Sequence, residues 1–193
     1  MSKTDKQKWE KHYSSCTDDI SLPCEVLFEY QHLLPEQGVA LDLACGRGAN
    51  ALCLAKHGLS VSAWDISAAA LEHLVQLAQN NNLTIRVEER DVISKPPEPD
   101  TFDIIVISHF LERKLIPDIR NSVKPGGMIF YQTFIKEKSN NTGPTNPDYL
   151  QDQNELLIFF KDWRIIIYRE EGNIGNTTKG FRNQAMLIAR KPL

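Results

Sequence analysis

Short apolar runs alternate along the chain with longer segments whose apolar residues recur every three or four positions. The length of these runs is typical of buried strands, and the first five lie at 39–43, 61–64, 84–88, 102–107 and 128–134. Ser67 can cap a helix whose apolar face is formed by Leu71, Leu74, Val75 and Ala78. Strands and helices in this alternating order predict a parallel sheet whose crossover connections are helices.

The two ends of the chain depart from this alternation. Before the first strand we expect a polar helix at about 4–13 and a second helix that buries Val26 and Leu27. Near the other end, strands are expected at 164–168 and 185–189, joined by a glycine-containing stretch with no helical pattern. Such a connection suits an antiparallel last strand, so the prediction is a mixed sheet of seven strands.

The stretch 39–50 reads as a strand that runs into a glycine turn and then into a helix. Gly46 and Gly48 allow positive φ and the close approach of a ligand to the backbone. The free N–H groups of the following helix point to the same place. Asp42 lies near the end of an otherwise apolar strand, where its charge is unfavourable unless something pairs with it. A cationic ligand group would be such a partner.

Three interpretations of this turn are open. Gly46-x-Gly48-x-x-Ala51 fits the dinucleotide fingerprint. Asp42-x-Ala44-x-Gly46-x-Gly48 fits the loop that binds S-adenosylmethionine, with Ala44 at a position where glycine is frequent. A dinucleotide brings a pyrophosphate, whereas S-adenosylmethionine brings an ammonium and a sulfonium, so the acid favours the second interpretation. A turn without a ligand leaves Asp42 unexplained. The methyl group of Ala44 is expected to be tolerated provided that its φ stays negative.

Composition and charge narrow the class of partner. Apolar residues make up 41% of the chain, charged residues 24%, and the net charge is −3, which argues against a nucleic-acid partner. The lysines within residues 3–11 are interrupted by acids, so we interpret them as a solvated helix face. The N-terminus is too polar for a signal peptide, and no apolar run approaches the ~20 residues of a membrane span. Zinc-site spacing is not seen among Cys16, Cys24, Cys45 and Cys53.

From these features we expect a cytoplasmic protein that needs neither a membrane nor a metal. The cysteines suit a reducing compartment, where Cys45 and Cys53 would pack as small apolar residues. The chain is expected to form a single domain over residues 1–193, in which residues 1–37 are an N-terminal helical cap and residues 38–193 the core. The oligomeric state stays open.

Five segments in this order resemble the class I S-adenosylmethionine-dependent methyltransferases: Leu41–Gly48, Val61–Ser67, Arg90–Val92, Phe102–Ser108 and Lys124–Gly127. Further segments, including Trp9–Tyr13 and the 185–192 ending, are most similar to the bacterial tellurite-resistance methyltransferase family. The resemblance spans nearly the whole chain. It implies a Rossmann-like three-layer α/β sandwich, S-adenosyl-L-methionine as cofactor, and methyl transfer to a small molecule. A chalcogen oxyanion or a thiol is the acceptor that this family suggests.

The resemblance also implies site residues. Asp42 and the turn 44–48 would hold the methionine end of the cofactor. Asp65 would accept hydrogen bonds from both ribose hydroxyls, or serve as a favourable charge beside the helix that follows it. Ile66 and Asp91 would contact the adenine. The full cofactor set is Tyr13, Asp42, Leu43, Ala44, Cys45, Gly46, Asn50, Asp65, Ile66, Asp91, Val92 and Ser108.

The acceptor is expected just past the fourth strand, at Ser108, His109 and Phe110. His109 is either a general base or a polar wall of the pocket, and the wall is favoured because an anionic acceptor needs no base. Arg113 and Arg182 are candidate contacts for an anionic substrate, with a plain surface charge as the alternative for each. Two other functions stay open: a non-catalytic module that binds S-adenosylmethionine, and an NAD-dependent dehydrogenase, against which Asp42 argues.

Overall fold

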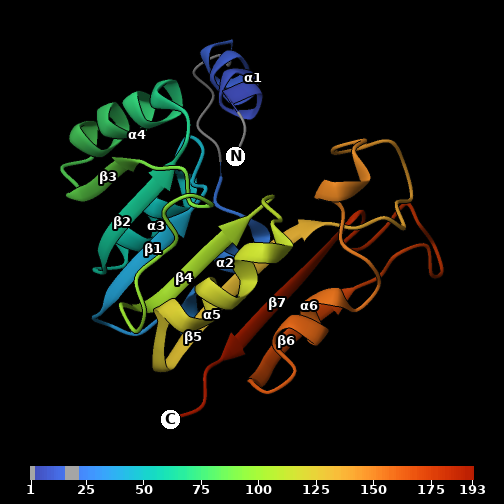
Figure 1. Ribbon diagram of the computed structural model, residues 1–193. Coiled ribbons are helices and arrows are strands. Elements are labelled where there is room, and N and C mark those ends of the chain that lie inside the picture. The colour runs from blue at the N-terminus through green and yellow to red at the C-terminus, as the bar shows by residue number, and fades with distance from the viewer. Residues whose placement is uncertain (1–2, 16–21) are drawn as a thin grey trace.

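A seven-stranded sheet forms the centre of the molecule (Figure 1). The computed structural model describes residues 3–15 and 22–193, with side chains from residue 6 onward in the first range. Within these residues the strand order is β3-β2-β1-β4-β5-β7-β6, and only β7 is antiparallel to its neighbours. The expected mixed sheet with an antiparallel last strand is therefore confirmed. The strands are β1 (Val39–Leu43), β2 (Ser60–Asp65), β3 (Ile85–Glu89), β4 (Phe102–Ser108), β5 (Val123–Phe134), β6 (Arg164–Glu170) and β7 (Gln184–Arg190).

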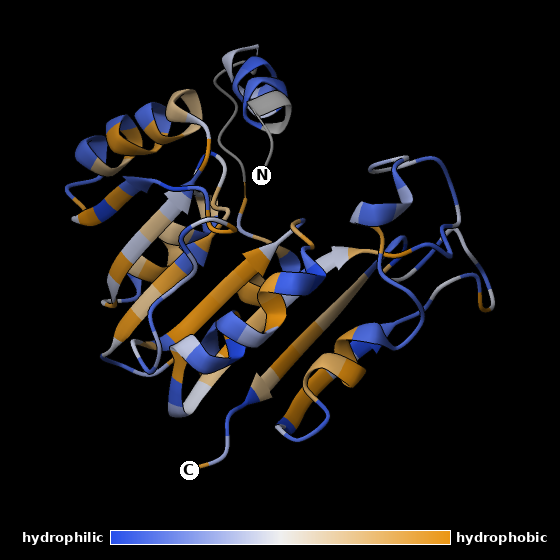
Figure 2. Cartoon of the chain, in the orientation of Figure 1, coloured by the Kyte–Doolittle hydropathy of each residue, from blue (hydrophilic) through white to orange (hydrophobic). Residues whose placement is uncertain are grey.

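Helices cover both faces of the sheet and create an apolar cluster on each. One cluster includes side chains from α2 (Glu25–Tyr30), α3 (Ala49–Lys56) and α4 (Ala68–Asn80). The other includes side chains from α5 (Ile116–Ser122) and α6 (Glu155–Phe159). Figure 2 shows apolar central strands between these layers and a largely hydrophilic α1 (Lys3–Ser14). Single 3₁₀ turns occupy Gln31–Leu33, Arg113–Leu115 and Pro147–Tyr149.

The fifth strand begins earlier than the apolar pattern indicates. The apolar pattern places the start of this strand at residue 128, but Lys124–Gly127 is already part of β5. Val123 already pairs with Phe102, and the register shifts before Met128 pairs with Ile104. The glycines absorb this irregularity, since a Cβ at Gly127 would stand 2.8 Å from the carbonyl oxygen of Asp103.

The carboxyl ends of β1, β2 and β4 meet at one edge of the sheet, which we call the carboxyl edge. Leu43 of β1 lies between Trp64 of β2 and Ile107 of β4. Helix α1 packs against α4 at this edge (Figure 1). The carboxyl edge of a parallel sheet is where ligands of α/β folds bind. Across the described ranges, no helix combines the length and apolarity that crossing a membrane would require.

Candidate functional site

The glycine turn between β1 and α3 uses positive φ at three positions. Gly46 has φ +52 and Gly48 has φ +79, as two glycines allow. Ala44 has φ +55, so the condition under which its methyl group would be tolerated, a negative φ, is not met. The tight exit from β1 requires the left-handed conformation there, which costs a non-glycine residue roughly 1–2 kcal/mol. Strain of this kind is kept where the surrounding structure imposes it, often at functional sites.

Asp42 lies beneath this turn with no exposed surface. Its carboxylate accepts hydrogen bonds from the Ala51 backbone N–H at 3.0 Å and from Nδ2 of Asn50 at 3.4 Å. Burial raises the pKa of Asp42 to about 7, although these two hydrogen bonds oppose the rise. Among the described residues no cationic side chain pairs with it. These contacts tie Asp42 to the first turn of α3, and its role toward a ligand stays a prediction.

Asp65 joins the end of β2 to the glycine turn. One carboxylate oxygen accepts the Gly46 N–H at 2.7 Å, and the other accepts the Ser67 N–H at 2.9 Å. Burial raises the pKa of Asp65, while these backbone donors oppose the rise. Ser67 caps α4 by accepting from the Ala70 N–H at 3.3 Å, as expected. The neighbouring Ile66 is half-buried at the same edge.

The segment after β3 completes this side of the edge. The Arg90 N–H donates to the Asp65 carbonyl at 2.8 Å, which brings the end of β3 beside β2. Asp91 is half-buried and accepts the Ile93 N–H at 3.0 Å. The Val92 side chain is buried in the core, so only its backbone can face a ligand.

Helix α1 closes over the carboxyl edge. The Tyr13 hydroxyl lies 2.6 Å from the point where a Cβ on Gly46 would stand. The Glu10 carboxylate accepts from the Ser67 hydroxyl at 2.7 Å and from the Ala69 N–H at 3.2 Å, at the N-terminus of α4. Such a position favours an acid. Glu10 and the start of α4 are more than 50 positions apart in the chain, so no local pattern around Glu10 reveals this contact.

Two lysines of α1 also contact residues outside this helix. Lys6 pairs with Glu89 at the end of β3. The Lys8 ammonium lies 4.9 Å from the ring centroid of Tyr149, on the opposite side of the edge. Both lysines are exposed, as expected for a solvated face, and still make these surface contacts. Helix α1 therefore contacts both the end of β3 and the loop that follows β5.

Asn50 connects the glycine turn to the end of β4. Its Nδ2 donates to the Ser108 hydroxyl at 3.0 Å, and its Oδ1 accepts the Cys24 N–H at 2.9 Å. Asp42, Asn50 and Ser108 therefore form one buried polar chain. Leu43 is buried, and the Cys45 side chain packs in the apolar cluster of α3 and α4, with Cys53 partly buried against it. The small apolar role expected for these two cysteines is confirmed, whereas Cys16 lies outside the described residues.

His109 follows Ser108 in the left-handed region, with φ +56. Its backbone N–H donates to the Gln132 carbonyl at 2.8 Å, and its ring stacks on Phe134 with centroids 4.8 Å apart. The ring Nε2 lies 2.8 Å from Oε1 of Gln184. Partial burial lowers the pKa of His109, which keeps the ring neutral at pH 7. Sequence reasoning missed Gln184, which is distant along the chain and has no motif around it. Phe110 packs against the core, and its carbonyl accepts the Tyr131 hydroxyl at 2.9 Å.

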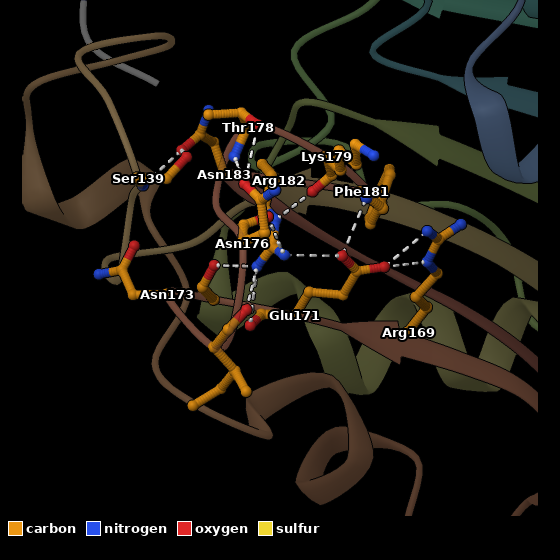
Figure 3. A network of polar contacts seen from close by, with 12 residues as sticks. Ser139, Arg169, Glu171, Asn173, Asn176, Thr178, Lys179, Phe181, Arg182 and Asn183 are labelled. Atoms are coloured by element: carbon orange, nitrogen blue, oxygen red, sulfur yellow. Dashed lines mark hydrogen bonds and ion pairs between the residues drawn. The ribbon is translucent and has the colours of Figure 1, made fainter.

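Neither candidate arginine presents a free guanidinium. Arg113 donates to the Glu155 carboxylate at 2.6 and 2.9 Å and to the carbonyls of Asp148 and Leu150, each at 3.0 Å. Arg182 lies at the centre of the polar network in Figure 3, where it donates to five backbone carbonyls between residues 171 and 179. Both side chains organise loops, and their contact with an anionic substrate stays a prediction. Within the described ranges, no group of three or more His, Cys, Asp or Glu side chains is arranged to hold a metal.

Comparisons with known proteins agree with this geometry. Residues 40–127 match a methyltransferase domain family. TehB of Haemophilus influenzae, described as a probable S-adenosyl-L-methionine-dependent methyltransferase, is 29% identical over 167 residues, which cover 78% of this chain and 56% of TehB. The chain therefore spans little more than half the length of this relative.

Solved structures give the same fold. The crystal structure of Haemophilus influenzae TehB has a TM-score of 0.72 at 24% identity, over 95% of this chain and 67% of that one. A SAM-dependent methyltransferase from Methanosarcina mazei has a TM-score of 0.67 at 20% identity, over 90% of this chain and 100% of that one. At these identities the likeness establishes the architecture.

Proposed function

We propose that this chain, whose residues 40–127 match a methyltransferase domain family, transfers a methyl group from S-adenosylmethionine to a small molecule at the carboxyl edge. The observation that supports the proposal best is the contact between its two cofactor motifs. Asp65, which ends β2, accepts the Gly46 N–H at 2.7 Å, so the acid and the glycine turn form one site. An acid at the end of the second strand is suited to the hydroxyls of a ribose.

The residues at this edge fit the cofactor. A Cβ at Gly46 would crowd the Tyr13 hydroxyl. Position 46 therefore has space for a glycine backbone but for no side chain. Asp65 keeps acceptor capacity beyond its two backbone donors, because each carboxylate oxygen has a second lone pair. Half-buried Ile66 offers an apolar surface to an adenine ring. When bound, S-adenosylmethionine supplies a methyl group on a positively charged sulfur. A nucleophile can take up this methyl group because the sulfur is a good leaving group.

Each part of the edge has a proposed task. The turn 44–48 faces the methionine end, Asp65 accepts from the ribose hydroxyls, and Asp91 with the Val92 backbone contacts the adenine edge. Tyr13 covers the turn from α1. Ser108, held by Asn50, and His109 line the place where the acceptor meets the methyl group. Orientation of the two reactants supplies most of the rate enhancement, since effective molarities of ~10⁵ M or more are available to a well-aligned pair.

The acceptor that we propose is a small chalcogen nucleophile, such as a thiol or a chalcogen oxyanion. The resemblance to the tellurite-resistance methyltransferase family suggests this class, and TehB, which is described as a probable methyltransferase, is among the relatives of this chain. The net charge of −3 is unfavourable for a polyanionic acceptor such as a nucleic acid. Cys24, Cys45 and Cys53 are free thiols, which suits action in a reducing cytoplasm.

Calorimetry with S-adenosylmethionine, S-adenosylhomocysteine and NAD tests the cofactor first. We expect the first two to bind and to stabilise the protein by about 2.7 kcal/mol at a hundredfold excess over Kd. Binding of NAD alone would overturn the proposal in favour of a dehydrogenase.

Radioactive methyl transfer then tests the reaction. The protein and S-adenosylmethionine carrying a tritiated methyl group are incubated with thiols, selenite, tellurite and fractionated small-molecule pools. Labelled product with a chalcogen compound supports the proposal, and label in another class of compound would correct the acceptor. Tight cofactor binding without labelled product from any pool would instead favour a non-catalytic binding module.

A further inference from the structure

A chain of hydrogen bonds runs from α2 through the sheet to His109. The Val26 backbone N–H donates to Oε1 of Gln132 at 2.9 Å. Nε2 of Gln132 lies 2.9 Å from Oε1 of Gln184. The same Oε1 lies 2.8 Å from Nε2 of His109. Gln132 lies in β5 and Gln184 in the adjacent β7, and His109 directly follows the end of β4 at the carboxyl edge (Figure 1).

The direction of every link follows from the first one. A backbone N–H can only donate, so the oxygen of the Gln132 amide must face Val26. The nitrogen of that amide then faces Gln184 as a donor, and Gln184 must present its oxygen. An amide oxygen only accepts, so Nε2 of His109 must hold a hydrogen. In a neutral imidazole the lone pair is then on Nδ1.

The surroundings of His109 keep this arrangement in place. The left-handed backbone and the Gln132 carbonyl hold the residue, and Phe134 covers one face of the ring. Burial lowers the pKa of His109, while Gln184 and the charge of Glu25 in α2 act to raise it. Among the described residues, no group bonds to Nδ1, and the side chain reaches the surface at this edge.

We propose that Gln184 is a positioning residue that holds His109 as the Nε2–H tautomer, so that Nδ1 receives the proton of a protic acceptor. The inference rests on the proposed methyl transfer and deepens it: the acceptor is a thiol, selenol or similar X–H compound rather than a fully deprotonated oxyanion. The X–C bond forms as the bond from the methyl carbon to sulfur breaks, and that electron pair stays on sulfur. The X–H proton moves to Nδ1 and leaves to solvent when the imidazolium is deprotonated.

The tautomer can be measured without cofactor or acceptor. In ¹⁵N-labelled protein, two-dimensional NMR of the imidazole distinguishes the two neutral tautomers, and His109→Ala assigns the signal. We expect Nε2–H in the wild type and loss of that single tautomer in Gln184→Leu. Gln184→Glu retains an oxygen that accepts from Nε2 of Gln132 and from Nε2 of His109, so His109 should keep its Nε2–H. The added negative charge should raise the pKa of His109. Gln153→Leu makes the same change at an exposed position and should leave the signal unaltered. An Nδ1–H tautomer in the wild type would overturn the proposal.

Kinetics test the proton transfer itself. With a thiol or selenol acceptor, His109→Ala should lower kcat by about 10²–10⁴-fold and remove the acidic limb of the pH profile of kcat/KM. Gln184→Leu should lower kcat with little change in KM. Gln184→Glu should restore kcat and move the acidic limb to higher pH. An unchanged pH profile in His109→Ala would refute the role of Nδ1 while methyl transfer stands, whereas loss of cofactor binding in the wild type refutes the proposed function. If Gln184→Leu fails to fold, the wild-type spectrum still tests the tautomer of His109, and the kinetics of Gln184→Glu still test the role of Gln184.

Discussion

The buried carboxyl of Asp42 should make the stability of this protein fall as pH rises through the weakly acidic range. Asp42→Asn removes the titrating group with little change in shape. The introduced amide can still accept the Ala51 N–H, although its nitrogen then faces Nδ2 of Asn50, which is now 3.4 Å from the carboxylate. That mismatch adds a constant cost that does not depend on pH, so the pH dependence isolates the carboxyl.

The sign and size of the effect follow from the pKa of Asp42. Burial raises it from an ordinary 3.8 to about 7, so between these values the folded state holds a proton that the unfolded chain has lost. Stability then falls with rising pH by about 1.4 kcal/mol per pH unit, and by about 4 kcal/mol over the whole window. Below the window both states are protonated and above it both are ionised, so the slope disappears at each end.

Urea denaturation of the ligand-free protein at pH 5, 6, 7 and 8 measures this slope. The free energy of unfolding of wild type minus that of Asp42→Asn should fall by about 2 kcal/mol between pH 5 and pH 7, because the slope flattens as the folded-state carboxyl begins to ionise near its pKa. Asp103→Asn is a matched control. Partial burial would raise the pKa of Asp103, but Lys124 and the Val39 N–H hold it below its ordinary value, so its difference should not fall over this range. If the difference in free energy of unfolding between wild type and Asp42→Asn does not change with pH, the reasoning is refuted.

Three further substitutions test the site. Gly46→Val should abolish S-adenosylmethionine binding in calorimetry because its Cβ would meet Tyr13, whereas Gly175→Val, at φ +68 with open space around it, should leave binding intact; equal affinities in both would contradict the loop assignment. Ala44→Gly should raise the free energy of unfolding by up to about 1 kcal/mol, since it relieves a positive φ at a small cost in unfolded-state entropy, and a decrease in urea stability would argue against strain there. Asp65→Ala should weaken cofactor binding by about 1.5–3 kcal/mol and also lower the melting temperature, because two backbone N–H groups lose their acceptor; normal binding with a lower melting temperature would leave Asp65 a purely structural role.

The parts of the site that lie in local motifs could be predicted from the sequence. The turn after β1, the acid that ends β2 and the Ser67 cap depend on neighbours within a few residues, and each stands where its pattern indicates. Contacts with distant partners could not be predicted in the same way. Arg113 and Arg182 read as free cations because nothing beside them in sequence reveals the carboxylates and carbonyls that they contact.

Hydrophobic period and turn chemistry act over short distances, so the order of strands and helices, the mixed sheet and the position of the cofactor motifs follow from local patterns in the chain. The folded arrangement was needed to show that Asp42 is buried beneath α3, that Glu10 binds the start of α4, and that Gln184 contacts His109. These contacts join residues far apart in the chain, in the last case 75 positions. Side-chain hydrogen bonding of this kind depends on which strands become neighbours, and no local pattern encodes that choice.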